Sequence, residues 1–441
     1  MKTSDVGYDV LKAFSPQLER TSTREKIWIG FLLAMMAFGM YALYLQIAQG
    51  HGVTGMRDYV VWGVYISNFM FLIGLSYAGA LIAGLLFLAQ VEWGRPLFRL
   101  AQMMTIASVI VGPLFILLCV GRLDRLHHLF IYPRLQSPMI WDVVAVVTFL
   151  TGSVLFLYLS LIRDFALYSQ SDLKLSNWKR KLYRVLSLGY NDIEEQRRAL
   201  MMSLNLLSLV LIPLSVIVAS ILSWIFGMTL RPGWHSTIFG PYFVLGAIYS
   251  GSAALILIMW VYRKIYKLEN FITDTHFRYI GYFMLLFAAG YGYFTFSEYF
   301  TSWYGSEKWD GELIEKLFSA HQYGWYTFFA HAVGILVPVM VVAVPALRKT
   351  GLIVFAALIA VVAMWIKRYL IVVPTLETPL LPMQDIRSDY VNYSITWVEW
   401  GLTLAGIALF LLLFTLAGKF MTIMPVTGWP RRQTTQSDQK S

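Results

Sequence analysis

Long apolar runs separated by short polar connections dominate this 441-residue chain. Ten of the runs have the length, roughly 20 residues, that a helix needs to cross the hydrocarbon core of a bilayer. Because backbone N–H and C=O groups must be paired inside a bilayer, each run predicts a transmembrane α-helix. The predicted helices cover residues 27–47, 61–89, 101–120, 143–162, 201–226, 242–262, 280–300, 325–347, 352–373 and 397–420. The pattern therefore predicts an all-α integral membrane protein with ten transmembrane helices.

A short similarity between the second and sixth predicted helices indicates an internal repeat. GLSYAG at 74–79 and GAIYSG at 246–251 share the pattern G-x-x-Y-small-G, 172 residues apart. It predicts that helices two to five and helices six to nine are two repeats in parallel orientation. Each repeat would form a four-helix bundle, and helices one and ten would flank the pair. Close packing of small residues is the alternative explanation. The expected division is a segment at 1–26, helix one with the first bundle at 27–240, the second bundle with helix ten at 241–424, and a tail at 425–441.

Three prolines, Pro113, Pro213 and Pro338, lie inside predicted helices three, five and eight. Proline has no backbone N–H and its ring disturbs the preceding turn, so each should kink its helix. The kinks should also free carbonyl oxygens toward the bundle interiors.

Composition and charge support this assignment and orient the chain. Apolar residues make up 58% of it and charged residues 14%, against about a quarter charged in a soluble domain. The net charge of +10 comes from basic residues scattered over short loops, so no nucleic-acid partner is expected. Lys and Arg number 25 on the side of the termini, 8 on the other side and 2 inside helix nine. The positive-inside rule then places both termini in the cytoplasm, assuming a bacterial inner membrane.

Few ionisable residues lie inside the predicted helices, and all of them are expected in the outer half of the membrane. A charged group facing lipid costs several kcal/mol, so such residues are expected to be paired or functional. Asp142 opens helix four; its structural alternatives are a salt bridge to Arg122 or an N-terminal cap. The second bundle is either a mutually neutralising network or a proton relay. Its candidates are Glu298, His331, Lys367, Arg368 and Glu399.

The residues argue against a redox cofactor held by the chain itself. The single cysteine, Cys119, cannot supply an iron–sulfur or zinc site, which needs several ligands. Of the 7 histidines only His331 lies well inside a predicted helix, so a haem held by two facing histidines is not expected. Nucleotide-binding and hydrolase motifs are absent from the sequence. We expect no haem, iron–sulfur cluster or metal in this chain.

Two motifs in the connections carry a family resemblance. PGWHST at 232–237 together with SPMIWD at 137–142 resembles the NrfD and polysulfide-reductase membrane-subunit family. The similarity is greatest to its ten-helix branch, found in alternative complex III and in the quinone reductase complex of sulfate reducers. It extends over nearly the whole chain, through WGVYISN at 62–68, Gly121-Arg122, LSLG at 186–189, ITD at 272–274, SEY at 297–299 and the segment 365–373.

The resemblance implies a cofactor-free subunit that exchanges electrons with a membrane quinone, menaquinone or ubiquinone, near the periplasmic surface. The implied partners are a ferredoxin-like iron–sulfur subunit docked outside, with a molybdopterin-type-fold subunit and a multihaem c-type cytochrome beyond. Proton translocation is a further expectation. Asp142 matches an acid at the start of helix four in the alternative complex III relative. Cys119 and Ile225 stand here where that relative has a His and an acid.

A quinone site needs a flat apolar slot, a hydrogen-bond partner for the quinone carbonyl and a group that exchanges protons. We expect Asp142 to be the catalytic proton exchanger. The expected quinone-binding residues are Cys119, Arg122, His127, His128, Trp141, Asp142 and His235. Exposed loop positions are the alternative for His127 and His128. Two other functions stay open: a passive membrane anchor, because two pocket residues differ, and a secondary transporter, because of the repeated bundles.

Overall fold

The computed structural model describes residues 18–19, 21–171, 173, 175–305, 307–378 and 392–426, and these are helical with short connections. Ten helices in this part of the chain are long and apolar enough to cross a membrane, which confirms the predicted fold class. Most of the expected N-terminal segment and C-terminal tail, residues 1–17 and 427–441, lies outside the described residues.

The spanning helices are α2 (Thr23–Gln49), α3 (Gly63–Ala89), α4 (Arg95–Cys119), α6 (Pro138–Gln170), α8 (Glu194–Gly227), α9 (Phe239–Tyr266), α10 (Asp274–Gly305), α14 (Thr350–Leu376), α15 (Trp397–Phe420) and an interrupted eighth helix. The eighth helix consists of α12 (Gly324–Phe328), a π-helical segment η4 (Phe329–Leu336) and α13 (Val337–Ala343). The connections include α5 (His128–Ile131), α7 (Asn177–Leu186) and α11 (Lys308–Phe318). Several helices extend beyond the apolar runs, so that Arg99 and Asp164, expected in connections, lie inside α4 and α6.

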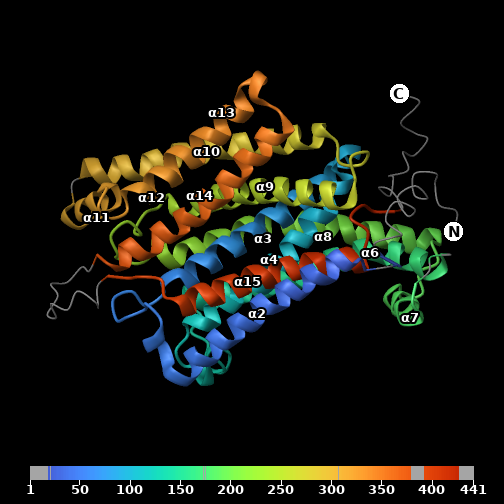
Figure 1. Ribbon diagram of the computed structural model, residues 1–441, viewed down its shortest axis with the longest axis horizontal. Coiled ribbons are helices and arrows are strands. Elements are labelled where there is room, and N and C mark those ends of the chain that lie inside the picture. The colour runs from blue at the N-terminus through green and yellow to red at the C-terminus, as the bar shows by residue number, and fades with distance from the viewer. Residues whose placement is uncertain are drawn as a thin grey trace.

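The start of α2 and the end of α15 lie at the same end of the molecule. α2 and α15 pack side by side along one edge (Figure 1). Near their ends, Lys419 Nζ lies 2.6 Å from Glu25 Oε1. We call this the terminal end; α7 lies there too, whereas α11 lies at the opposite end (Figure 1).

The remaining helices pack in two groups of four. In the first, α3 contacts α4 and α8, and α6 contacts the same two helices. In the second, α9 contacts α10 and α14, and α13 contacts the same two helices. The groups meet chiefly where α3 lies against α9. The division into the bundles of helices two to five and six to nine stays a prediction.

The two repeated motifs pack against each other in the α3–α9 contact. A Cβ added to Gly74 would lie 3.6 Å from Ala247 Cβ, and one added to Gly251 would lie 2.2 Å from Ala78 Cβ. The contact pairs are 173 residues apart in both cases, as expected for two parallel helices in register. The repeat thus forms the interface between the groups, and Gly251 allows their closest approach.

Pro338 explains part of the interruption in the eighth helix. It has no N–H to donate to the carbonyl of Gly334, four residues earlier. The Tyr249 hydroxyl donates to that Gly334 oxygen at 2.5 Å. Tyr249 belongs to the second copy of the repeat motif, so the repeat tyrosine compensates for the lost helical hydrogen bond.

Replacing Gly251 by alanine should destabilise the fold. The added Cβ would overlap Ala78 Cβ, and overpacking of this kind costs about 1–3 kcal/mol. We expect a lower denaturant midpoint for the detergent-purified Gly251→Ala variant. The control is Gly30→Ala on α2, where an added Cβ meets no atom within 4 Å. Equal midpoints for the two variants would contradict the close α3–α9 contact.

Candidate functional site

One face of α6 forms a line of buried residues through the first group of helices. Asp142, Phe149, Ser153, Phe156 and Asp164 are all buried, and their spacings of seven, four, three and eight residues place them on one helical face. Asp142 is 6% exposed and Asp164 1%. The 22 residues between them correspond to roughly 33 Å of helix, close to the thickness of a hydrocarbon core. The two carboxyl groups therefore lie near opposite ends of the bundle.

The carboxylate nearer the terminal end is fully paired. Arg99 Nη1 lies 2.5 Å from Asp164 Oδ2, and both side chains are buried. Arg99 also donates to the carbonyl oxygens of Ser160 and Thr422 at 3.1 Å each. Sequence reasoning missed this pair because it placed both residues outside the helices. The sequence did contain a signal for this pair. Arg99 lies within one helical turn before the run at 101–120, and Asp164 lies within one turn after the run at 143–162.

Asp142 is buried without such a partner. Among the described residues no hydrogen bond or ion pair reaches its carboxyl group, and its Oδ1 atom is fully buried. Ser137 occupies the N-cap position of α6, so Asp142 lies about one turn inside the helix and does not cap it. Arg122 instead pairs with Asp124 at 2.9 Å in an exposed connection, and this hydrogen bond lowers the pKa of Asp124. Neither structural alternative for Asp142 is present in the described part of the chain.

A tyrosine from α3 lies on the same side of the first group. The Tyr77 ring packs edge-on against Phe149, with centroids 5.1 Å apart. Its hydroxyl is buried without a hydrogen-bond partner and lies within the electrostatic range of Asp142. Tyr77 belongs to the first copy of the repeat motif and was not predicted as a site residue. The first group thus contains two buried polar groups without hydrogen-bond partners.

The other residues expected around Asp142 do not all approach it. Arg122, His127 and His128 are exposed, and the two histidine rings contact each other. Trp141 donates from Nε1 to the Leu135 carbonyl at 2.6 Å. The two histidines therefore occupy exposed positions of the connection between α4 and α6, and a quinone-binding role for these four residues stays a prediction.

Cys119 lies beside a group of aromatic rings that we call the aromatic trio: Trp62, Phe226 and Trp234. The Cys119 sulfur lies 3.8 Å from the Trp62 carbonyl oxygen. Trp62 stacks on Trp234 with centroids 5.9 Å apart, and Phe226 meets both indoles edge-on. The trio joins α8, the start of α3 and the 228–238 connection into an apolar wall at the opposite end of the molecule.

In the second group of helices, Lys367 organises a chain of hydrogen bonds. Its side chain is 2% exposed, and its Nζ donates to the Tyr299 hydroxyl at 2.8 Å. His331 must donate from Nδ1 to the Thr327 carbonyl, 2.8 Å away, which leaves Nε2 to accept from Tyr299 at 3.5 Å. Glu298 Oε2 lies 3.8 Å from Lys367 Nζ. Three of the five candidates, Glu298, His331 and Lys367, are thus linked directly or through Tyr299, and both the neutralising network and the proton relay stay predictions.

The two remaining candidates of this group have other surroundings. The Arg368 guanidinium stacks over the Phe243 ring at 4.5 Å. Glu399 accepts hydrogen bonds from the backbone of Gly55 and Thr396 and from the Thr396 and Tyr393 hydroxyls. It forms the capping box at the start of α15. Glu399 thus has a structural role, and its contacts add nothing to the relay prediction.

His235 lines a cavity of about 180 Å³ that belongs to the second group of helices, and Asp142 is not among the lining residues. The cavity lining includes His235, Glu298, Glu307 and Asp310. A smaller cavity next to it is lined by Glu298, Tyr299, Lys367 and Asp310. His235 therefore lies at the mouth of the Lys367 network.

A larger cleft of about 620 Å³ lies between α12, α14 and the start of α15. Aromatic side chains make up much of its wall: Tyr323, Tyr326, Trp365, Tyr369, Tyr393 and Trp400. The Tyr323 hydroxyl donates to Glu377 Oε2 at 3.0 Å, and burial raises the pKa of Tyr323, which keeps that donor protonated. We call this the aromatic cleft. Sequence reasoning did not predict it.

Comparison with known proteins places this architecture in a family. The family model described as polysulphide reductase, NrfD, matches residues 52–379. The chain belongs to the NrfD family. The match covers both groups of helices up to the end of α14, and so includes Asp142, the aromatic trio and the Lys367 network.

Individual relatives are named as subunits of oxidoreductases. This NrfD-family chain is 24% identical to the menaquinone reductase integral membrane subunit of Nitratidesulfovibrio vulgaris, over 93% of this chain and 95% of that one. It is 22% identical to a selenate reductase subunit of Mesobacillus selenatarsenatis, over 90% and 94%. It is 29% identical to a putative dimethyl sulfoxide reductase membrane subunit of Halobacterium salinarum, where the match spans 57% of this chain and about half, 54%, of the relative.

Proposed function

We propose that this chain is the quinone-interacting membrane subunit of an oxidoreductase complex, with menaquinone as the favoured quinone. The observation that carries the proposal is the buried, unpartnered carboxyl group of Asp142 in an NrfD-family chain. A relative along nearly its whole length is named a menaquinone reductase subunit. Quinone reduction consumes protons together with electrons, so the site needs a proton exchanger beside the quinone head group.

The quinone is a substrate of the proposed site, which lies at the end opposite the terminal end. The aromatic trio, whose three rings pack on one another, is the apolar side of the proposed site. Asp142 and Tyr77 supply groups that can donate, accept or exchange a proton. A pocket of apolar walls with few polar groups is the usual composition of small-molecule sites. In this account Asp142 exchanges the proton, and the trio and Cys119 bound the slot.

Electrons reach or leave the quinone through partner subunits on the periplasmic side. We propose a ferredoxin-like iron–sulfur subunit docked at the opposite end, with a molybdopterin-type-fold subunit and a multihaem c-type cytochrome beyond it. The exposed connection between α4 and α6, with Phe130, Tyr132 and Leu135 more than half exposed, is a suitable docking surface. The names of the selenate and dimethyl sulfoxide reductase relatives also point to complexes with several subunits.

We also propose that the first group of helices conducts protons. Buried polar side chains occur along the first group from Asp142 through Tyr77, Ser108 and Ser153 toward Gln102. These side chains lie on α3, α4 and α6 of the first group. Polar groups inside a membrane bundle are expensive and mark proton paths in pumps. We propose that protons taken from the terminal end reach Asp142 along this line.

The orientation of the chain is testable by itself. We infer from the charge count that the terminal end is cytoplasmic, and the ion pair between Glu25 and Lys419 supports one side for the start of α2 and the end of α15. We therefore expect activity from a cytoplasm-specific reporter that is fused after residue 441. Activity of a periplasm-specific reporter at the same position would reverse the proposed docking side.

Replacing Asp142 by asparagine tests the site. Asparagine keeps the size and hydrogen-bonding capacity of the side chain but removes its proton exchange. We expect an assembled complex whose quinone-linked rate falls by about 10²- to 10⁴-fold, as is typical for a lost acid–base group. Electron transfer among the outer subunits, measured with an artificial donor, should not change.

The matched control is Glu269→Gln, which alters an exposed carboxylate in the connection between α9 and α10 and should leave the quinone-linked rate unchanged. An assembled Asp142→Asn complex with the full rate would remove Asp142 from the reaction and favour a non-redox anchoring role.

A further inference from the structure

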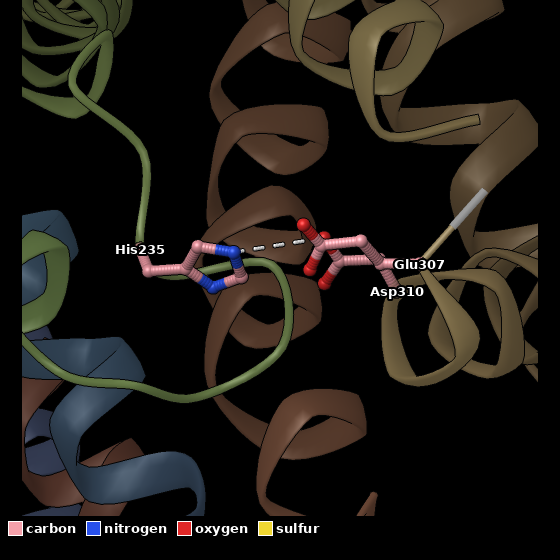
Figure 2. A group of neighbouring side chains, drawn as sticks. All are labelled: His235, Glu307 and Asp310. Atoms are coloured by element: carbon pink, nitrogen blue, oxygen red, sulfur yellow. Dashed lines mark ion pairs between the residues drawn. The ribbon is translucent and has the colours of Figure 1, made fainter. Parts of the chain in front are cut away.

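The mouth of the Lys367 network holds three potential metal ligands from two separate segments. His235 comes from the connection between α8 and α9, whereas Glu307 and Asp310 come from the beginning of α11. One ligand atom of each lies within 4.8 Å of the others. Figure 2 shows the imidazole ring pointing toward the two carboxylates. The chemistry proposed above makes no use of this cluster.

The backbone fixes which nitrogen of His235 faces the carboxylates. His235 Nδ1 lies 3.0 Å from the Arg231 carbonyl oxygen; because a carbonyl oxygen can only accept, Nδ1 carries the proton. Nε2 then points at Asp310 Oδ2, 3.8 Å away. In the neutral ring Nε2 is an acceptor, as is the carboxylate, so the contact is favourable when a cation lies between them or when a proton on Nε2 makes it an ion pair. A backbone carbonyl on the second ring nitrogen is the usual support of a metal-binding histidine.

Asp310 is fixed in the same way. The residue is 8% exposed, and its Oδ1 accepts the backbone N–H of Gly233 at 3.0 Å. Gly233 has φ of +71° in the turn before His235, a conformation that suits glycine. The turn therefore holds both the histidine and the N–H that orients the aspartate, so two of the three ligands are preorganised.

A third carboxylate, which also faces Lys367, lines the cavity behind the cluster. Glu298 lines the cavity of about 180 Å³ with His235, Glu307 and Asp310. Its Oε2 atom is buried without a hydrogen-bond partner, and its nearest cation is Lys367 Nζ at 3.8 Å. Three carboxylates and one histidine around a single cavity leave a negative site with space for a hydrated ion.

We propose that His235, Glu307 and Asp310 bind a divalent transition-metal ion of the Zn²⁺ class at the mouth of this cavity. One imidazole nitrogen and two carboxylate oxygens suit Zn²⁺ and its neighbours. Ligand atoms about 2.0–2.2 Å from one ion lie at most about 4.4 Å apart, so small side-chain rotations close the site. Water completes the coordination. The bound ion lies between the Lys367 network and the exterior, which makes occupancy a means of controlling access to Glu298.

The competing explanation is purely structural, because acidic residues at a helix start stabilise it and Asp310 also holds the Gly233 turn. A measurement of metal binding distinguishes this structural explanation from the proposed metal site. The intact complex, purified without a histidine tag and freed of metal with a chelator, is titrated with Co²⁺ as a spectroscopic probe. We expect saturable binding of one ion per chain, with the absorption bands of nitrogen- and oxygen-ligated Co²⁺, and competition by Zn²⁺.

His235→Ala should weaken Co²⁺ binding by at least about tenfold, since loss even of a residue that supports a ligand costs about 10–100-fold. Glu307→Gln should weaken it similarly; Glu307 is exposed, so this variant tests the site even if His235→Ala fails to fold. The control is His321→Ala, an exposed histidine after α11, which should bind as the parent does. No saturable binding, or equal binding by the parent and both ligand variants, would overturn the proposal.

Discussion

Burying an ionisable group in the hydrocarbon layer is costly unless the group is paired, and this constraint organises the polar interior of the protein. Arg99 and Asp164 pair directly, Lys367 has Tyr299 and Glu298, and Glu399 accepts four hydrogen bonds. Among the described residues, Asp142 is buried with its carboxyl group unpaired. A buried carboxyl group without a structural partner is a candidate for function, since its cost is otherwise uncompensated.

The repeat motif connects the packing of the helices to these polar groups. Its glycines let α3 and α9 approach closely, while its tyrosines turn into opposite groups of helices. Tyr77 lies toward Asp142 on helix four, and Tyr249 donates to Gly334 on helix eight. Helices four and eight are equivalent in the proposed repeat. In the first group the helix facing the repeat tyrosine carries the carboxyl group of Asp142. In the second group the equivalent helix contains the π-helical segment η4, beside the charged Lys367 network.

The fold could be predicted from sequence more fully than the site. Runs of apolar residues are sufficient to define ten helices, because a bilayer imposes their length and composition. Contacts between connections are not encoded in such a pattern. The sequence grouped His235 with Asp142 because both were expected at the outer helix ends, yet the turn at Gly233 directs His235 to Asp310 on α11. Arg99 and Asp164 were missed because charged residues end an apolar run even where the helix continues.

The position of the quinone is the central claim, and labelling with a photoreactive menaquinone analogue tests it most directly. After illumination of the intact complex, peptide analysis should find the label beside the aromatic trio and Asp142, at the start of α3, the start of α6 or the end of α8. Competition by excess menaquinone should remove it. A competed label confined to Tyr323, Tyr326 or Trp365 would place the quinone in the aromatic cleft and contradict the role given to Asp142.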